Sequence, residues 1–141
     1  MAAGNIRLEI VTPEKAVVSE DAQIVMAPGT LGEFGVLTGH TPFMTTLKLG
    51  TIRFVDATGK EQFVFISGGF AEALPDKVTI LAESAERGVH IDVERAKSAL
   101  QRAQERLSKE DDKTIDRERA RAAMERALHR LKIAAMKTAR S

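Results

Sequence analysis

The strongest constraint on the fold of this 141-residue chain is where its glycines and prolines lie. All ten glycines and all four prolines precede Ile91, and the sequence from Ile91 onward contains neither. Ala, Arg, Glu and Leu dominate that stretch, and these residues are strong helix formers, whereas Gly and Pro are typical of turns. The sequence therefore predicts a turn-rich domain over residues 1–86 and a helical domain over residues 87–141.

The N-terminal domain shows the alternation that is typical of β proteins. Ile6, Leu8 and Ile10 share one face of a strand, while Arg7 and Glu9 share the other. Further runs of strand character are Ala16–Val18, Gln23–Ala27, Gly35–Leu37, Phe43–Leu49, Ile52–Val55, Gln62–Ile66 and Val78–Leu81. Predicted turns are Thr12–Pro13, Pro28–Gly29, Thr41–Pro42, Asp56–Gly59 and Pro75–Asp76. Many short strands at close spacing indicate an all-β sandwich or flattened barrel.

The C-terminal domain contains two stretches in which apolar residues recur at i, i+3, i+4, i+7 and i+11. These residues are Ala96, Ala99, Leu100, Ala103 and Leu107 in the first stretch, and Ala120, Ala123, Met124, Ala127, Leu128 and Leu131 in the second. The polar connection, Ser108–Lys113, is short, which predicts an antiparallel helical hairpin. Because an alanine-rich seam buries little apolar area, two interpretations stay open: a detachable arm, or a stable pair that caps the sandwich.

The charges divide unevenly along the chain. Residues 1–90 hold 7 basic and 11 acidic side chains, residues 91–112 hold 5 and 6, and residues 113–141 hold 9 and 3. An acidic body therefore ends in a basic arm. The chain has no cysteine, which excludes disulfides and thiolate metal sites. No stretch approaches the roughly 18 apolar residues that span a bilayer, so we expect membrane association only through a partner.

No set of residues predicts catalysis. His40, His90 and His129 lie far apart, and none has another metal-binding residue at a recognisable spacing. The glycine-rich stretch Pro28–Gly35 does not end in the Lys-Ser/Thr pair that a phosphate-binding loop requires. Ser67–Gly69 lacks the spacing of a nucleophile elbow. We therefore predict a chain that is not an enzyme, with no catalytic residue and no metal site.

One group of charged residues indicates ligand binding. Asp92, Arg95 and Arg102 lie near one face of the first helix, and Arg126 and Arg130 are one turn apart on the second. If the helices fold back, four guanidinium groups beside a carboxylate could hold a polyphosphate. The alternative is purely structural, since Asp is a good helix N-cap and exposed arginines are common.

Several separated segments resemble the epsilon subunits of F-type ATP synthases, over essentially the whole chain. They are Leu8–Pro13, Gly32–Pro42, Ser67–Glu72 and Val78–Glu83, followed by two Ala/Arg-rich helices. The resemblance implies a flattened ten-stranded β-sandwich in the central stalk. It also implies gamma and the membrane rotor c-ring as partners, with Glu33 and His40 as candidate rotor contacts. Their alternative roles are a turn carboxylate and a capping imidazole.

The segment Ile91–Ala96 matches the I-D-x-x-R-A pattern of epsilon subunits that bind ATP. The resemblance implies a regulatory ATP, with magnesium left open and no required cofactor. The implied binding residues are Glu86, Ile91, Asp92, Arg95, Ala96, Arg102, Arg126 and Arg130. A folded arm would hold ATP, and an extended arm would place its basic second helix against the alpha-beta catalytic ring and inhibit hydrolysis. The expected location is the cytoplasmic face of the cell membrane, as a peripheral subunit.

Two other classes of function are weighed against this one. An arginine-rich hairpin could bind nucleic acid phosphates, but it carries no aromatic residue to stack on bases and the body is acidic. A small hydrolase would need a reactive residue that the sequence does not offer. We therefore expect no nucleic acid partner and no direct membrane insertion.

Overall fold

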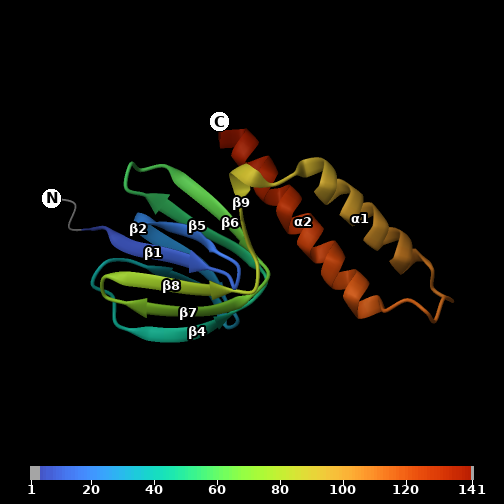
Figure 1. Ribbon diagram of the computed structural model, residues 1–141, viewed down its shortest axis with the longest axis horizontal. Coiled ribbons are helices and arrows are strands. Elements are labelled where there is room, and N and C mark those ends of the chain that lie inside the picture. Colours follow the sequence, from blue (N-terminus) through green and yellow to red (C-terminus); the bar gives the residue numbers. More distant parts are fainter. Residues whose placement is uncertain (1–3, 141) are drawn as a thin grey trace. The chain divides into compact units, whose positions relative to one another are not determined.

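The computed structural model describes the backbone of residues 4–140 and the side chains of residues 4–136. The chain forms two compact units, which separate between Arg87 and Gly88. Strands make up the first unit and helices make up the second (Figure 1).

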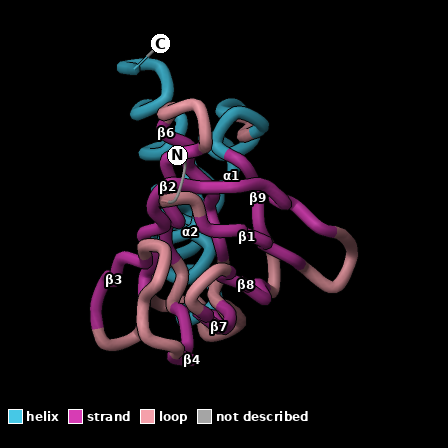
Figure 2. The backbone as a smooth tube through the Cα atoms, turned by 90° about the vertical axis from the view of Figure 1, so that its left-hand side faces the viewer, coloured by secondary structure: helices cyan, strands magenta, loops and turns pink. Residues whose placement is uncertain are grey.

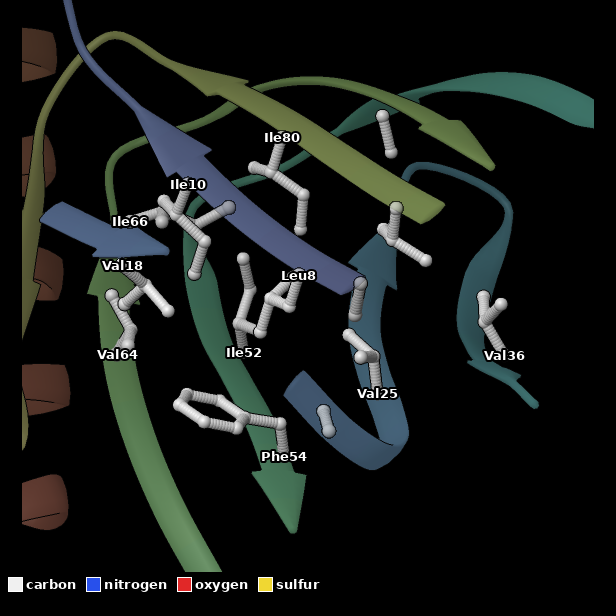
Figure 3. Close-up of a cluster of buried hydrophobic side chains, with 14 of the residues drawn as sticks. Leu8, Ile10, Val18, Val25, Val36, Ile52, Phe54, Val64, Ile66 and Ile80 are labelled. Atoms are coloured by element: carbon white, nitrogen blue, oxygen red, sulfur yellow. The ribbon is translucent and has the colours of Figure 1, made fainter. Parts of the chain in front are cut away.

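Nine strands are formed by the described residues of the first unit. They are β1 (Ile6–Val11), β2 (Ala16–Gly29), β3 (Gly32–Val36), β4 (Phe43–Leu47), β5 (Gly50–Asp56), β6 (Glu61–Ile66), β7 (Gly69–Leu74), β8 (Lys77–Ala82) and β9 (Ala85–Arg87). Their order is β1-β8-β7-β4-β2-β5-β6-β9, with β3 paired to β2 and a further pairing between β1 and β2. The strand β3 lies beside the end of β2 at the edge of the sheet (Figure 2). The sheet folds into two layers, one that contains β1 and one that contains β5 (Figure 3). The long strand β2 joins these layers, because it pairs with β1 along its first part and with β5 along its second.

Apolar side chains from both layers fill the space between them (Figure 3). The alternation predicted for the first strand is confirmed, since Ile6, Leu8 and Ile10 are fully buried while Arg7 is exposed. These residues face Ile52 and other side chains of β5 and β6 across the core. This cluster is aliphatic apart from Phe54, while Phe63 and Phe65 of β6 are also buried.

The second unit is the predicted helical hairpin. A short 3-10 helix (Gly88–His90) precedes α1 (Val93–Ser108), and α2 (Arg117–Arg140) packs against α1. The two α-helices run antiparallel (Figure 1). Both contain the predicted apolar positions. The connection between them spans residues 109–116, so it starts one residue later and ends three residues later than the predicted Ser108–Lys113.

The strand count and one turn differ from the sequence-based expectations. The resemblance implied ten strands, but the described residues form nine. The runs Ala16–Val18 and Gln23–Ala27 belong to the single strand β2, because the polar segment between them pairs with β1. Pro28 and Gly29 end β2 and are not the turn, which lies at Thr30 and Leu31. Proline lies here at the end of the strand, and its carbonyl oxygen accepts from Lys48 N at 3.0 Å.

Candidate functional sites

The Ser67–Gly69 motif of the first unit has a structural role. Gly69 begins β7 with a φ of +155°, and a Cβ placed there would lie 2.1 Å from the carbonyl oxygen of Leu81. Only glycine permits this close approach of β7 to β8. The Ser67 hydroxyl accepts a hydrogen bond from the Ser84 hydroxyl at 2.8 Å. Among the described residues, no group of three or more His, Cys, Asp or Glu side chains could hold a metal ion.

Asp92 is the N-cap of α1. Its backbone is extended, with φ −81° and ψ 103°, and its Oδ1 accepts from the backbone N–H of Arg95 at 3.0 Å. The interaction between these two residues is thus made by the amide of Arg95 and leaves its guanidinium exposed. This confirms the predicted capping role. The second carboxylate oxygen of Asp92 has no protein partner within the part of the chain that the structure describes.

Alanine forms the seam of the hairpin. Ala96 and Ala103 on α1 are each 2% exposed, and Ala120 and Ala127 on α2 are each 1% exposed. Each pair is seven residues apart, which is two helical turns, so each pair lies on one face of its helix. The small side chains let the two helices lie close together while burying little apolar surface.

An arginine immediately precedes each of these four alanines. Arg95 and Arg102 precede the pair on α1, while Arg119 and Arg126 precede the pair on α2. One residue corresponds to a rotation of about 100° around a helix. Because the helices run antiparallel, the same offset from the seam places both arginine rows on the same side of the hairpin. The structure therefore brings the predicted arginines of the two helices to a common side.

The two rows continue to the tip of the hairpin, which the sequence-based prediction missed. Arg106 lies four residues beyond Arg102, and it shares a pocket of about 430 Å³ with Arg119. The pocket is also lined by Thr114, Ile115, Asp116 and Ala120. The Arg-Ala pair repeated every seven residues in both helices is the sequence pattern that would have found Arg119.

The remaining predicted nucleotide-binding residues are distributed over both units. Glu86 lies in β9 of the first unit, where it pairs with Phe65 of β6. Ile91 follows the 3-10 helix, and its backbone N–H donates to Gly88 O at 3.3 Å. Arg126 and Arg130 are half-buried on α2. Seven of the eight predicted residues are thus in the second unit, and Glu86 is in the first.

The two candidate rotor contacts have different surroundings. Glu33 lies in β3, and its Oε1 accepts from Arg53 Nη2 at 3.1 Å, with both side chains well exposed. His40 follows β3 in the next loop, and its ring lies 4.7 Å from the ring of Phe43, centroid to centroid. The Nδ1 atom of His40 is buried and has no hydrogen-bond partner among the described residues. The capping role considered for His40 is therefore not supported through Nδ1.

Family models match both units of the chain. Residues 5–88 match the β-sandwich domain of the ATP synthase delta/epsilon chain, and residues 90–135 match the long α-helix domain of the same chain. No helix in the described part is both long and apolar enough to span a membrane.

Curated relatives and solved structures agree with these matches. The chain is 66% identical over 110 residues to the ATP synthase epsilon chain of Desulfatibacillum aliphaticivorans, covering 78% of each chain. It is 63% identical over 107 residues to that of Desulforapulum autotrophicum, covering 76% of this chain and 79% of the relative. A chain in the Euglena gracilis mitochondrial ATP synthase structure of OSCP, F1 and c-ring superposes with a TM-score of 0.75 at 26% identity. That match covers 94% of this chain and 81% of the other.

Both domain matches and the curated relatives lead to one assignment. This chain belongs to the family of ATP synthase epsilon chains, which are structural and regulatory subunits of the central stalk and not themselves catalytic.

Proposed function

We propose that the sandwich couples the rotor to the catalytic ring, and that the hairpin is a mobile arm whose folded state binds ATP. In its extended state the arm inhibits ATP hydrolysis. The observation that carries this proposal is the thin alanine seam of the hairpin, flanked by two arginine rows on one side. A weakly packed hairpin that presents arginines to an anion can change between its folded and extended states as that anion binds and dissociates.

The energies of the seam and of a ligand are comparable. Each buried methyl group contributes about 0.8 kcal/mol, so the four alanines together contribute about 3 kcal/mol before ordering entropy is subtracted. The side chain of Ile133 on α2 is also fully buried and adds about 1.5–3 kcal/mol. A ligand that binds only the folded hairpin stabilises it by about 2.7 kcal/mol at a hundredfold excess over its Kd. A ligand present at a hundredfold excess over its Kd can therefore decide whether the folded or the extended arm dominates.

ATP is the ligand that this chemistry favours. Arg95, Arg102, Arg126 and Arg130 supply guanidinium groups, which bind phosphates through charge-assisted hydrogen bonds. The free carboxylate oxygen of Asp92 can accept from the ribose or the base. Glu86, Ile91 and Ala96 complete the proposed set. ATP acts here as a regulatory ligand, with or without magnesium, and no cofactor is required.

The extended arm has an electrostatic reason to bind elsewhere. Residues 113–141 carry 9 basic and 3 acidic side chains, a net charge of +6. Such a helix is complementary to an acidic surface, which we propose lies on the alpha-beta catalytic ring. No nucleic acid partner is proposed.

The sandwich is the part that we propose contacts gamma and the membrane rotor c-ring. Glu33 is held in place by Arg53 and remains about half exposed, so it is positioned to accept from a partner. His40 lies in the loop after β3 and is partly exposed; because its Nδ1 atom is buried, we propose that the rest of the ring makes the rotor contact. The subunit would act on the cytoplasmic face of the cell membrane, held there by these partners.

Removal of the arm tests the inhibitory role. A chain truncated after His90, reassembled into its ATP synthase, should raise ATP hydrolysis while leaving assembly and proton-driven synthesis in place. Hydrolysis equal to that of the full-length complex, with assembly intact, would contradict the proposal.

ATP binding is tested separately on the isolated chain by calorimetry. Arg102→Met should weaken binding about tenfold or more, as expected for the loss of a charge-assisted hydrogen bond. Arg121→Met is the matched control, because Arg121 is an exposed arginine of α2 that precedes no seam alanine. Equal affinity in both variants and the parent would remove Arg102 from the site.

A further inference from the structure

We propose that Arg117 is a latch, meaning that its two hydrogen bonds to the end of α1 hold the helices together as a hairpin. These hydrogen bonds must break before the helices separate. The side chain starts in the first turn of α2 and reaches the end of α1. Its Nη1 donates to Leu107 O at 3.0 Å, and its Nη2 donates to Lys109 O at 2.7 Å. The side chain is half-buried. Its regulatory consequence rests on the proposed function, but the latch itself does not.

The carbonyl groups that Arg117 binds lie at the C-terminal end of α1. The last carbonyls of an α-helix have no intrahelical donor, and Leu107 O gains its donor from Arg117. Lys109 is the C-cap residue, and its carbonyl oxygen also accepts from Asp112 N at 3.3 Å. The planar guanidinium donates to the two carbonyl oxygens from two different nitrogens, whereas a lysine would have to reach both from one nitrogen. The positive charge also lies at the negative end of the α1 dipole.

The position of Arg117 within its own helix supports this role. It is the first residue of α2, where the helix dipole disfavours a cation by a few tenths of a kcal/mol to about 1 kcal/mol. Hydrogen bonds to charged groups contribute about 1.5–3 kcal/mol, so the contact with α1 outweighs that cost. The N-terminus of α2 has its own cap, because Asp116 Oδ1 accepts from Arg119 N at 3.0 Å.

The connecting loop is braced without Arg117. Asp112 Oδ1 accepts from the backbone N–H of Thr114 at 2.9 Å and from its hydroxyl at 2.5 Å. Loss of the latch should therefore leave the loop and both helices folded, and should change only how firmly the helices are held together.

The latch matters for the arm because the arginine rows need a closed hairpin. Arg102 and Arg126 share one side only while the two seams face each other. When the helices part, the two rows part as well, and any anion held by both loses half of its contacts. Opening of the latch should thus favour the extended arm.

Distance measurements on the full chain without nucleotide test the latch. The chain has no cysteine, so Gln104→Cys and Glu125→Cys, both at exposed positions, allow one spin label on each helix. The parent should give one short distance. Arg117→Met should raise the ratio of separated to closed hairpins about tenfold, with helix content by circular dichroism unchanged. Arg117→Lys should give a smaller rise.

Arg121→Met is the control for loss of one positive charge on α2 and should match the parent. Unchanged distances in Arg117→Met would overturn the latch, and so would equal changes in Arg117→Met and Arg121→Met. If Arg117→Met loses helix content, the Arg117→Lys variant decides, and the absence of any rise there refutes the latch. In the reassembled enzyme, Arg117→Met should deepen inhibition of hydrolysis. A changed distance with unchanged hydrolysis would retain the latch and reject the inhibitory arm.

Discussion

Asp92 combines a structural role with a proposed ligand role, and two substitutions separate them. Asp92→Ala removes both the cap and the charge. Asp92→Asn keeps the cap, because Asn and Asp are equally good N-caps, but removes the charge. The cap is seen directly in the 3.0 Å hydrogen bond from Arg95 N, whereas the ligand role rests on the oxygen that this bond leaves free.

The expected magnitudes differ between the two variants. Loss of an N-cap costs about 1 kcal/mol, so Asp92→Ala should lower the hydrogen-exchange protection of the first turns of α1 about fivefold. Asp92→Asn should leave that protection unchanged. Loss of the carboxylate as an acceptor costs about 1.5 kcal/mol, so both variants should bind ATP at least about tenfold more weakly.

Hydrogen exchange and calorimetry on the same preparations provide the assay. Glu94→Gln is the control, because it removes a neighbouring negative charge from the first turn of α1 on a side chain that is 86% exposed. It should alter neither quantity by more than twofold. Parent-like ATP affinity in Asp92→Asn would show that the carboxylate is not a ligand. Lost protection in that variant would refute the capping argument instead.

Three further predictions concern stability. Gly69→Ala should lower the free energy of unfolding by about 3 kcal/mol in denaturant titration, since its Cβ would meet the Leu81 carbonyl oxygen; a change below 1 kcal/mol would contradict this. The hydroxyl of Thr58, then Gln62 and the amide of Lys60, lower the pKa of Asp56 from 3.8 to about 2. Because the folded pKa is the lower one, this stabilisation is present above pH 4 and is lost as the pH falls towards 2, so Asp56→Ala should flatten the acid limb of stability; an unchanged limb would exclude this carboxylate as its cause. Ala103→Leu should overfill the seam, costing about 1–3 kcal/mol and lowering hydrogen-exchange protection of both helices, whereas unchanged protection would show that the seam has room.

Local sequence patterns determined the division of this protein and the nature of each part. The absence of Gly and Pro after Ile91 leaves helices as the favoured structure. Asp92 caps the first of these helices by accepting a hydrogen bond from the amide of Arg95, which is only three residues away in sequence. The alternation of Ile6, Leu8 and Ile10 fixes which face of β1 is buried. These features depend on neighbours in sequence, which is why they could be predicted.

One short strand and the middle of a long one required the tertiary structure. The residues of β7, Gly69–Leu74, include Ala and Glu, which have little preference for strands. They form a strand because β4 and β8 lie on either side. The polar middle of β2 is likewise held in strand form by its pairing with β1. Backbone hydrogen bonds between distant segments decide such cases, and a local pattern does not record them.

The hairpin shows the same division within the candidate site. Spacing alone placed Arg95 with Arg102 and Arg126 with Arg130, since each pair lies on one helix. That Arg106 meets Arg119 at one pocket, and that Arg117 reaches the end of α1, depends on how far the two antiparallel helices are shifted along each other. The sequence determined which residues each helix presents. The packing of the helices decided which of them meet, because that shift is set by the seam and the connecting loop together.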